Sequence, residues 1–405
     1  MKTLLLSSHI YTENEKVSGG VLLADGVIKG IIPMEEVGEV SFDATVVDYG
    51  QNRILPGLID PHMHGYMGWT ASKTTDPTDV LKLADVMAIN GVTAFQPSCV
   101  STHYMEDNVT AIADAISMQE TGAKILGCYM EGPYYNPQYD GGTPVEFFRK
   151  PTLAEAQGFY EAGKGKLTSI GLAPELAGAD EVIDFFVQNG VRVGIAHTRA
   201  TYREGMDAIN RGCSMATHTF NAMRPLHHRE VGVAGAVLRN KEIYNEINCD
   251  LNHVCKEMME LLFELKPWNR ILMMTDTDPI AGLAAGRYLI DDREMICEPT
   301  GQIHLVDGTI YGSAHPLLYG LKNLVTVLDI PLEKAVRAAS LNQAEFLGIA
   351  AKKGSIAPGK DGDIIVIDED FSCIATYIAG EKVYDGAKQS RESFINPIYA
   401  EKRIG

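Results

Sequence analysis

Residues 54–65 read Ile-Leu-Pro-Gly-Leu-Ile-Asp-Pro-His-Met-His-Gly. The apolar run Ile54–Asp60 predicts a buried β-strand, because strands covered on both faces are built from nearly continuous apolar residues. His62 and His64 follow directly after this run. Residues separated by one position lie on the same face of an extended segment, so both imidazoles can reach one point beyond the strand. The stretch therefore predicts a strand whose carboxyl end carries two candidate metal ligands.

Seven further short apolar runs follow along the chain, and longer helical patterns such as Thr78–Asn90 and Glu106–Glu120 separate them. This alternation predicts a parallel sheet with crossover helices, and eight strands are the number that a closed barrel needs. The alternative is an open doubly wound sheet, but no Gly-rich phosphate loop follows the first run. We therefore predict an α/β fold, a (β/α)₈ TIM-like barrel. The eight runs are Ile54–Asp60, Val92–Pro97, Ile125–Glu131, Ser169–Pro174, Val191–His197, Cys213–His218, Ile243–Cys249 and Ile271–Asp276.

Both ends of the chain are rich in strand patterns and lie outside this alternation. Near the amino end, Asp25-Gly26 between apolar runs predicts a hairpin turn. Near the carboxyl end, the run Asp363–Asp368 has the composition of a strand. We predict one small β-sandwich domain formed by residues 1–52 and 355–405, joined to a barrel of residues 53–354.

Composition and charge exclude several classes of partner. No segment is apolar for long enough to span a bilayer. The net charge of −18 argues against nucleic acid or an anionic membrane as partner. The seven cysteines are odd in number and include no Cys-x-x-Cys pair, which favours free thiols in a reducing cytoplasm. An anionic substrate would need a locally basic pocket in such a chain.

Four histidines and two acids lie at or just beyond the carboxyl ends of the predicted strands. They are His62, His64, Glu131, His197, His218 and Asp276. Active sites of (β/α)₈ barrels are built at this rim. Imidazoles combined with carboxylates suit divalent metals such as zinc or iron better than calcium. A single His at a strand end is more often a hydrogen-bonded structural residue, but six such residues on one rim favour a metal site that activates water.

The chain also resembles a known family. Leu55–Gly65 is similar to the first-strand signature of the amidohydrolase superfamily. Five further motifs are similar to the N-acetylglucosamine-6-phosphate deacetylase family, and the resemblance covers nearly the whole chain. These motifs are Met130–Pro133, His218–Met223 (His-Thr-Phe-Asn-Ala-Met), Met274–Asp276, Asp307–Ser313 and Gly354–Asp363.

This resemblance implies one or two divalent metal ions. The implied ligands of the principal ion are Glu131, His197 and His218. The resemblance further implies a second metal position at His62 and His64, with Glu131 as the bridge. Dihydroorotases and hydantoinases bridge two metals with a carboxylated Lys instead, and no Lys ends a predicted strand. By the same resemblance Asp276 is the catalytic acid and base; the alternative is a metal ligand that transfers no proton.

A basic stretch follows the sixth predicted strand. Its charged or titratable residues are Arg224, His227, His228 and Arg229. Arginine suits the geometry of phosphate, although a solvated loop with chance positive charge is the alternative. The resemblance implies that Arg229 and His253 bind a sugar phosphate together with the backbone amides of Asn221 and Ala222. It also implies a homodimer, in which Arg229 comes from the neighbouring subunit.

One substrate-contacting position departs from the family. Relatives commonly carry a His shortly after the glutamate, where this chain reads Gly141-Gly-Thr143. The expected activity is hydrolysis of the N-acetyl amide of an amino-sugar phosphate, N-acetylglucosamine 6-phosphate to glucosamine 6-phosphate and acetate. Because Thr143 replaces the His, a different N-acyl amino sugar or another small amide, such as an N-acyl amino acid or a cyclic amide, stays open as substrate. A non-catalytic scaffold is the remaining hypothesis, and the complete set of candidate ligands argues against it.

Overall fold

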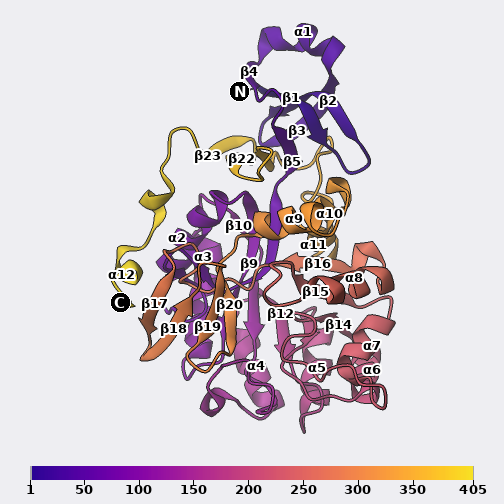
Figure 1. Ribbon diagram of the computed structural model, residues 1–405, viewed down its shortest axis with the longest axis vertical. Helices are drawn as coiled ribbons and strands as arrows, with labels where there is room; N and C mark the ends of the chain where they lie inside the picture. The colour runs from indigo at the N-terminus through magenta and orange to yellow at the C-terminus, as the bar shows by residue number, and fades with distance from the viewer. Residues whose placement is uncertain (1, 405) are drawn as a thin grey trace.

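The computed structural model describes residues 2–404, and eight parallel strands form a nearly closed barrel at its centre (Figure 1). Around the barrel the strands follow the order β6-β9-β11-β12-β13-β14-β15-β16. Each overlaps one of the eight predicted runs, so the (β/α)₈ class is confirmed. The strands are β6 (Leu58–Met63), β9 (Val92–Val100), β11 (Cys128–Glu131), β12 (Leu167–Leu172), β13 (Arg192–Ile195), β14 (Cys213–Ala216), β15 (Tyr244–Asn248) and β16 (Ile271–Met274).

Helices connect successive strands and cover the outside of the barrel (Figure 1). In the first of them, α2, Asp76 accepts a hydrogen bond from the Thr78 amide and Pro77 opens the helix. Val80, Leu83, Ala84 and Met87 recur at helical spacing and are buried, which fixes the face that packs on the barrel. The helices are α2 (Pro77–Ala88), α3 (Met105–Met118), α4 (Leu153–Ala162), α5 (Ala179–Gln188), α6 (Tyr202–Arg211), α7 (Gly232–Arg239), α8 (Lys256–Leu265), α9 (Leu317–Thr326), α10 (Leu332–Ala338) and α11 (Leu341–Phe346).

The barrel closes where its last strand meets its first. The Asp276 amide, just beyond β16, donates to the His62 carbonyl in β6 at 3.0 Å. At the amino end of the same seam the Ile59 amide donates to the carbonyl of Ala339, which precedes α11. The two residues joined at the carboxyl end are both candidate site residues, so closure of the barrel also brings the site together.

Strands from the two ends of the chain form a second sheet, in the order β23-β22-β21-β5-β1-β2-β3 with β4 beside β1. In Figure 1 it lies above the barrel. The predicted hairpin turn at Asp25-Gly26 is confirmed, because both residues have positive φ, 54° and 78°. The strands are β1 (Lys2–Tyr11), β2 (Lys16–Ala24), β3 (Val27–Pro33), β4 (Thr45–Asp48), β5 (Arg53–Pro56), β21 (Ile364–Ile367), β22 (Cys373–Ile378) and β23 (Glu381–Asp385).

An antiparallel sheet inserted after β16 was not expected from the sequence. It runs β20-β19-β18-β17-β24, and its last strand comes from the carboxyl end of the chain. Figure 1 shows this end, in yellow, passing from β23 down the side of the barrel through α12 (Pro397–Ala400). The strands are β17 (Gly286–Ile290), β18 (Arg293–Cys297), β19 (Gln302–Leu305), β20 (Ile310–Ser313) and β24 (Arg403–Ile404).

The domain boundaries at residues 52 and 355 stay a prediction. Two strands pair with the domain to which the prediction did not assign them. Strand β5, at residues 53–56, pairs with β1 and β21 of the terminal sheet. Strand β24, near the carboxyl end, pairs with β17 of the inserted sheet. Within residues 2–404, no helix combines the length and the apolar character that crossing a membrane requires.

Candidate active site

A cavity of about 370 Å³ opens at the carboxyl ends of the barrel strands. Five of the six candidate ligands line it, namely His64, Glu131, His197, His218 and Asp276. The sixth, His62, lies beneath them and is fully buried. The folded chain therefore brings together the six residues that the sequence places at the rim.

The six residues form two clusters of donor atoms. One consists of Glu131, His197 and His218, and the other of His62, His64 and Asp276; within each, the donor atoms lie within 4.8 Å of one another. Oε1 of Glu131 is 3.1 Å from Nε2 of both His197 and His218. Two imidazoles and one carboxylate oxygen thus converge on one point, as the ligands of a single ion do.

Glu131 faces both clusters with different oxygens. Its Oε2 is 3.1 Å from Nε2 of His64 and 3.7 Å from Nε2 of His62. Oδ1 of Asp276 is also 3.1 Å from that same Nε2. A carboxylate with one oxygen toward each cluster has the geometry of a bridge between two neighbouring cations.

The remaining ring nitrogens test whether a cation fits. Nδ1 of His197 is 2.8 Å from the Tyr139 carbonyl, and Nδ1 of His218 is 3.2 Å from the Asn221 carbonyl. A carbonyl only accepts, so each Nδ1 donates, and each ring turns its Nε2 toward the site. The two Nε2 atoms are 3.1 Å apart, and both face Oε1 of Glu131. Imidazoles held at Nδ1 by a carbonyl, with Nε2 converging on a carboxylate oxygen, are a usual ligand set of divalent metals, so the donor set fits such an ion.

The local charges agree with this fit. Burial opposes a charge on His64, but hydrogen bonds with Asp276 and Glu131 outweigh burial and raise the pKa of His64 to about 9. Burial would raise the pKa of Glu131, whereas hydrogen bonds from the surrounding imidazoles hold it well below its usual range. The pKa of Asp276 is also lowered, chiefly by His64 acting against burial. Both carboxylates are therefore ionised at neutral pH and available to a cation.

Three site residues have unusual backbone conformations. His197, His218 and Asp276 have φ values of 44°, 28° and 53°, in the left-handed region that non-glycine residues rarely adopt. Each lies where a barrel strand has just ended. Conformations of this kind persist where the surrounding structure fixes them, and they concentrate at functional sites. In this chain they turn three side chains inward over the barrel mouth.

Sequence reasoning missed Glu246 of β15, which supports the site from below. Its Oε2 is 3.0 Å from Nδ1 of His62 and also accepts a hydrogen bond from the His218 amide. Glu246 is 1% exposed. Its signal in the sequence was a charged residue inside an apolar run, Ile243–Cys249, since acids are rarely buried without a partner.

A second missed residue is Asp250, which fixes His253. Its Oδ2 is 2.8 Å from Nδ1 of His253, and its Oδ1 accepts from the His253 amide. Burial opposes a charge on His253, but this hydrogen bond outweighs it and raises the pKa of His253. The sequence signal was an Asp three residues before a His, directly after a strand. His253 is thereby favoured as a cation at the cavity wall.

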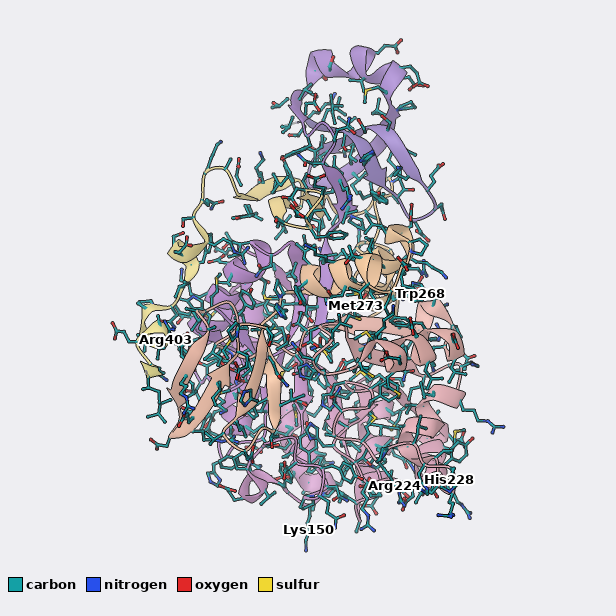
Figure 2. All side chains as sticks on the ribbon, in the orientation of Figure 1. Lys150, Arg224, His228, Trp268, Met273 and Arg403 are labelled. Atoms are coloured by element: carbon teal, nitrogen blue, oxygen red, sulfur yellow. The ribbon has the colours of Figure 1, made fainter. Side chains whose placement is uncertain are left out.

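The predicted substrate residues fall into two groups. Thr143, Asn221, Ala222 and His253 all line the cavity. Arg229 does not line it and is exposed. Figure 2 labels Arg224 and His228 of the same stretch at the outer edge of the barrel, at the lower right. Arg229 therefore cannot be assigned to the cavity of its own subunit.

A (β/α)₈ barrel whose rim presents paired imidazole and carboxylate clusters has the arrangement by which enzymes activate water for hydrolysis. The class is that of a metal-dependent hydrolase. The sequence model of the Amidohydrolase family matches residues 53–383, and the chain belongs to this family, within the group of the N-acetylglucosamine-6-phosphate deacetylases.

Relatives match over most of the chain. The N-acetylglucosamine-6-phosphate deacetylase of Vibrio furnissii is 30% identical, with 89% of this chain and 92% of that protein covered. The N-acetylgalactosamine-6-phosphate deacetylase of Escherichia coli O157:H7 is 32% identical, with 89% and 93% covered. Among solved structures, an aspartate-to-alanine variant of N-acetyl-D-glucosamine-6-phosphate deacetylase from Mycobacterium smegmatis, in complex with N-acetyl-D-glucosamine-6-phosphate, has a TM-score of 0.87. It is 26% identical, and 94% of this chain and 99% of that chain are covered.

Proposed function

We propose that the chain hydrolyses the N-acetyl amide of N-acetylglucosamine 6-phosphate to give glucosamine 6-phosphate and acetate. The observation that carries the proposal is the joint placement on one cavity of five of the six cluster residues and of Asn221, Ala222 and His253. Relatives that match over most of the chain are deacetylases of phosphorylated amino sugars. A phosphate beside a cationic His253 and an amide beside the clusters fit that class of substrate.

The ligand roles belong to the same proposal. We assign Glu131, His197 and His218 to a principal ion, and His62, His64 and Asp276 to a second position bridged by Glu131. We infer zinc or iron, because imidazole with carboxylate suits these ions. When bound, a divalent ion polarises a carbonyl oxygen and lowers the pKa of water to about 7.

Asp276 is assigned the proton transfers. Its carboxylate lies in the cavity beside His64 and is ionised at neutral pH. It can accept a proton from the attacking water and return that proton to the leaving nitrogen of the amino sugar. Glu246 holds the His62 ring, and Asp250 keeps His253 cationic against the phosphate.

We further propose a homodimer in which Arg229 reaches the cavity of the neighbouring subunit. Arg229 lies outside its own cavity, and the apolar Leu226 and Val231 nearby are 39% and 41% exposed. Exposed apolar side chains that flank a basic loop suit an interface.

A cytoplasmic location is proposed as well, because the seven cysteines of the described chain are free thiols.

N-acetylgalactosamine 6-phosphate is a second candidate substrate, since one relative of comparable identity acts on that epimer and Thr143 replaces the family His. The deciding experiment measures bound metal and then compares kcat/KM for the two N-acetylhexosamine 6-phosphates and for their unphosphorylated forms. We expect metal in the purified protein and clear preference for a phosphorylated sugar. Hydrolysis of N-acyl amino acids or cyclic amides, without hydrolysis of either sugar phosphate, would contradict the proposal.

A further inference from the structure

One wall of the cavity is contributed by loops after β6 and β9 and by the carboxyl end of the chain. We call it the β6–β9 wall and define it as Thr70, Ser72, Lys73, Val100 and Tyr399. The Val100 amide donates to the Ser72 carbonyl, which joins the two loops. The hydroxyls of Thr70 and Ser72 are 3.3 Å apart, and both residues are buried. The wall thus presents polar groups to the cavity.

Lys73 contributes the positive charge of this wall. Among residues 2–404 it is the only Lys or Arg that lines the cavity. Its Nζ is 3.2 Å from Oδ2 of Asp291, at the turn between β17 and β18. An ammonium has three donors, so Lys73 retains hydrogen-bonding capacity while Asp291 already balances its charge. A neutral oxygen suits this position better than a second anion.

Tyr399 reaches the wall from a segment that the family match, residues 53–383, does not include. The segment is fastened to the loop after His64: the Trp69 indole donates to the Phe394 carbonyl at 2.9 Å, and Asn396 donates to the Gly68 carbonyl at 3.0 Å. Burial raises the pKa of Tyr399, so its hydroxyl stays protonated and can donate.

The barrel topology determines what this wall faces. In the ring of eight strands, β9 is opposite β14, and Asn221 and Ala222 follow β14. The nitrogen and the carbon chain of the acyl group leave an amide carbonyl carbon in different directions. If the sugar phosphate lies at Asn221, Ala222 and His253, as the proposed function requires, the acyl group extends toward the β6–β9 wall.

We propose that the β6–β9 wall is an acyl-group subsite, and that it favours an acyl group bearing a hydroxyl on the carbon next to the carbonyl. The proposal rests on the proposed function and names a preference within it. A hydroxyacetyl group would offer an oxygen to Lys73 and Tyr399, two donors that this wall contributes to the cavity. An acyl group of equal size that ends in a methyl leaves those donors unpaired, and sites built to bind a hydroxyl discriminate strongly against analogues that lack it.

The test uses two substrates with the same number of heavy atoms, N-hydroxyacetyl- and N-propionyl-glucosamine 6-phosphate. We expect the metal-replete enzyme to show a kcat/KM at least about 10-fold higher for the hydroxyacetyl compound. Lys73→Met and Tyr399→Phe should each lower this ratio by about 5-fold or more, because each removes one donor and retains most of the side-chain volume. A merely structural role would change both substrates alike and leave the ratio unchanged.

Lys82→Met and Tyr160→Phe are the matched controls, since these residues lie on α2 and α4 and do not line the cavity. Both should keep the wild-type ratio. A wild-type ratio near one, or equal losses for both substrates in the Lys73 and Tyr399 variants, would overturn the acyl-subsite assignment while leaving the deacetylase activity standing. Absence of hydrolysis for every N-acyl hexosamine 6-phosphate would instead overturn the proposed function, and this assignment with it.

Discussion

Glu246 shows how much of the site depends on a residue outside the two donor clusters. Its carboxylate sits inside the barrel, where an uncompensated charge is costly, and His62 supplies the compensation. In return the carboxylate orients the His62 ring and leaves Nε2 facing Glu131 and Asp276. Groups that hold the far nitrogen of a metal-ligating His commonly affect metal affinity nearly as much as the ligands themselves.

We therefore expect Glu246→Gln to weaken binding of the second metal by about 10–100-fold. Glutamine keeps the size of the side chain but loses the charge that balances His62. Metal content after dialysis against graded chelator measures the effect. Glu242→Gln is the control, because Glu242 precedes the same strand and its side chain is 83% exposed. Unchanged metal affinity in the Glu246 variant would show that the His62 ring needs no charged partner.

Asp276→Asn tests proton transfer while the ligands of the principal metal stay in place. Glu131, His197 and His218 are untouched by this change, so we expect the principal metal to be retained. The amide cannot accept a proton from water and return it to nitrogen, so kcat should fall by about 10²–10⁴. Steady-state kinetics on protein of measured metal content decide the matter. Near-normal turnover in metal-replete protein would show that Asp276 transfers no proton and acts only as a metal ligand.

The Asp250–His253 pair predicts a pH dependence of substrate binding. The raised pKa of His253 means that the imidazolium persists above the ordinary value of 6.5 and is lost as the pH rises through the shifted value. A phosphate ester is already doubly charged above about pH 7, so His253 is the group that changes. KM for a phosphorylated substrate should therefore be low near neutrality and rise toward alkaline pH.

In Asp250→Asn this rise should move to lower pH, because burial without the carboxylate disfavours the imidazolium. At pH 7 we expect KM to increase about 10-fold, the lower end of the range for a hydrogen bond to a charged group. KM for the unphosphorylated sugar should not increase in this variant. The control Asp207→Asn, at a residue on α6 whose side chain is 70% exposed, should leave KM for both sugars unchanged. Parallel pH profiles for both sugars would remove His253 from phosphate binding.

At the scale of elements, the barrel was predictable and the inserted sheet was not. The barrel strands are buried on both faces, so their apolar runs stand out from the helices between them. Strands β17 to β20 are half-exposed, and they follow one another without helices. Such a stretch carries little periodic signal. The β24–β17 pairing joins residues far apart in the chain and left no local pattern at all.

The same scale explains which site residues could be found. A residue that directly ends an apolar run, such as His197 or His218, is marked by its position. Glu246 lies within a run and Tyr399 within an ordinary carboxyl-terminal stretch, so neither position marks a site. Their proximity to the cavity depends on barrel closure and on the path of the last residues, which are properties of tertiary structure.

The seam of the barrel gives a stability prediction for α11. Asn342 is fully buried, and its amide donates to the carbonyls of Trp268 and Ile271, both at 2.8 Å. Asn342→Leu leaves these buried carbonyls without that donor, so we expect the free energy of unfolding to fall by about 1–3 kcal/mol. Denaturant unfolding followed by circular dichroism measures this, with the exposed Asn14→Leu as control. Equal stability of both variants would mean that the seam needs no side-chain donors.

For the whole molecule, the net charge of −18 makes binding of a doubly charged substrate a problem of local electrostatics. In the part of the chain that is described, the cavity wall holds a single Lys or Arg, Lys73, which is paired with Asp291. His253, after β15, adds positive charge to the cavity wall. A further positive charge from a neighbouring subunit would add to that of His253 in binding the phosphate. Arg229, on the outer loop of that subunit, is the candidate.

Arg229→Ala should consequently raise KM for the phosphorylated sugar about 10-fold or more, with little change for the unphosphorylated sugar. Arg203→Ala is the control, since its side chain on α6 is 92% exposed. This result alone would not show which subunit supplies the arginine, because a mobile loop could return to its own cavity. The assignment across an interface needs an experiment in which the two copies carry different defects.

Mixed dimers provide that experiment. Arg229→Ala subunits keep the donor clusters, and His197→Ala subunits keep the arginine, so each homodimer is defective at low substrate concentration. In a mixed dimer one cavity combines intact ligands with the partner's arginine, while the other lacks both. Random pairing makes half of the dimers mixed, so about a quarter of wild-type kcat/KM should return on co-refolding. If Arg229 served its own cavity, every site would keep one defect and the mixture would show no more activity than the average of its parents. A monomeric protein by light scattering, with Arg229 still required, would also exclude the shared site.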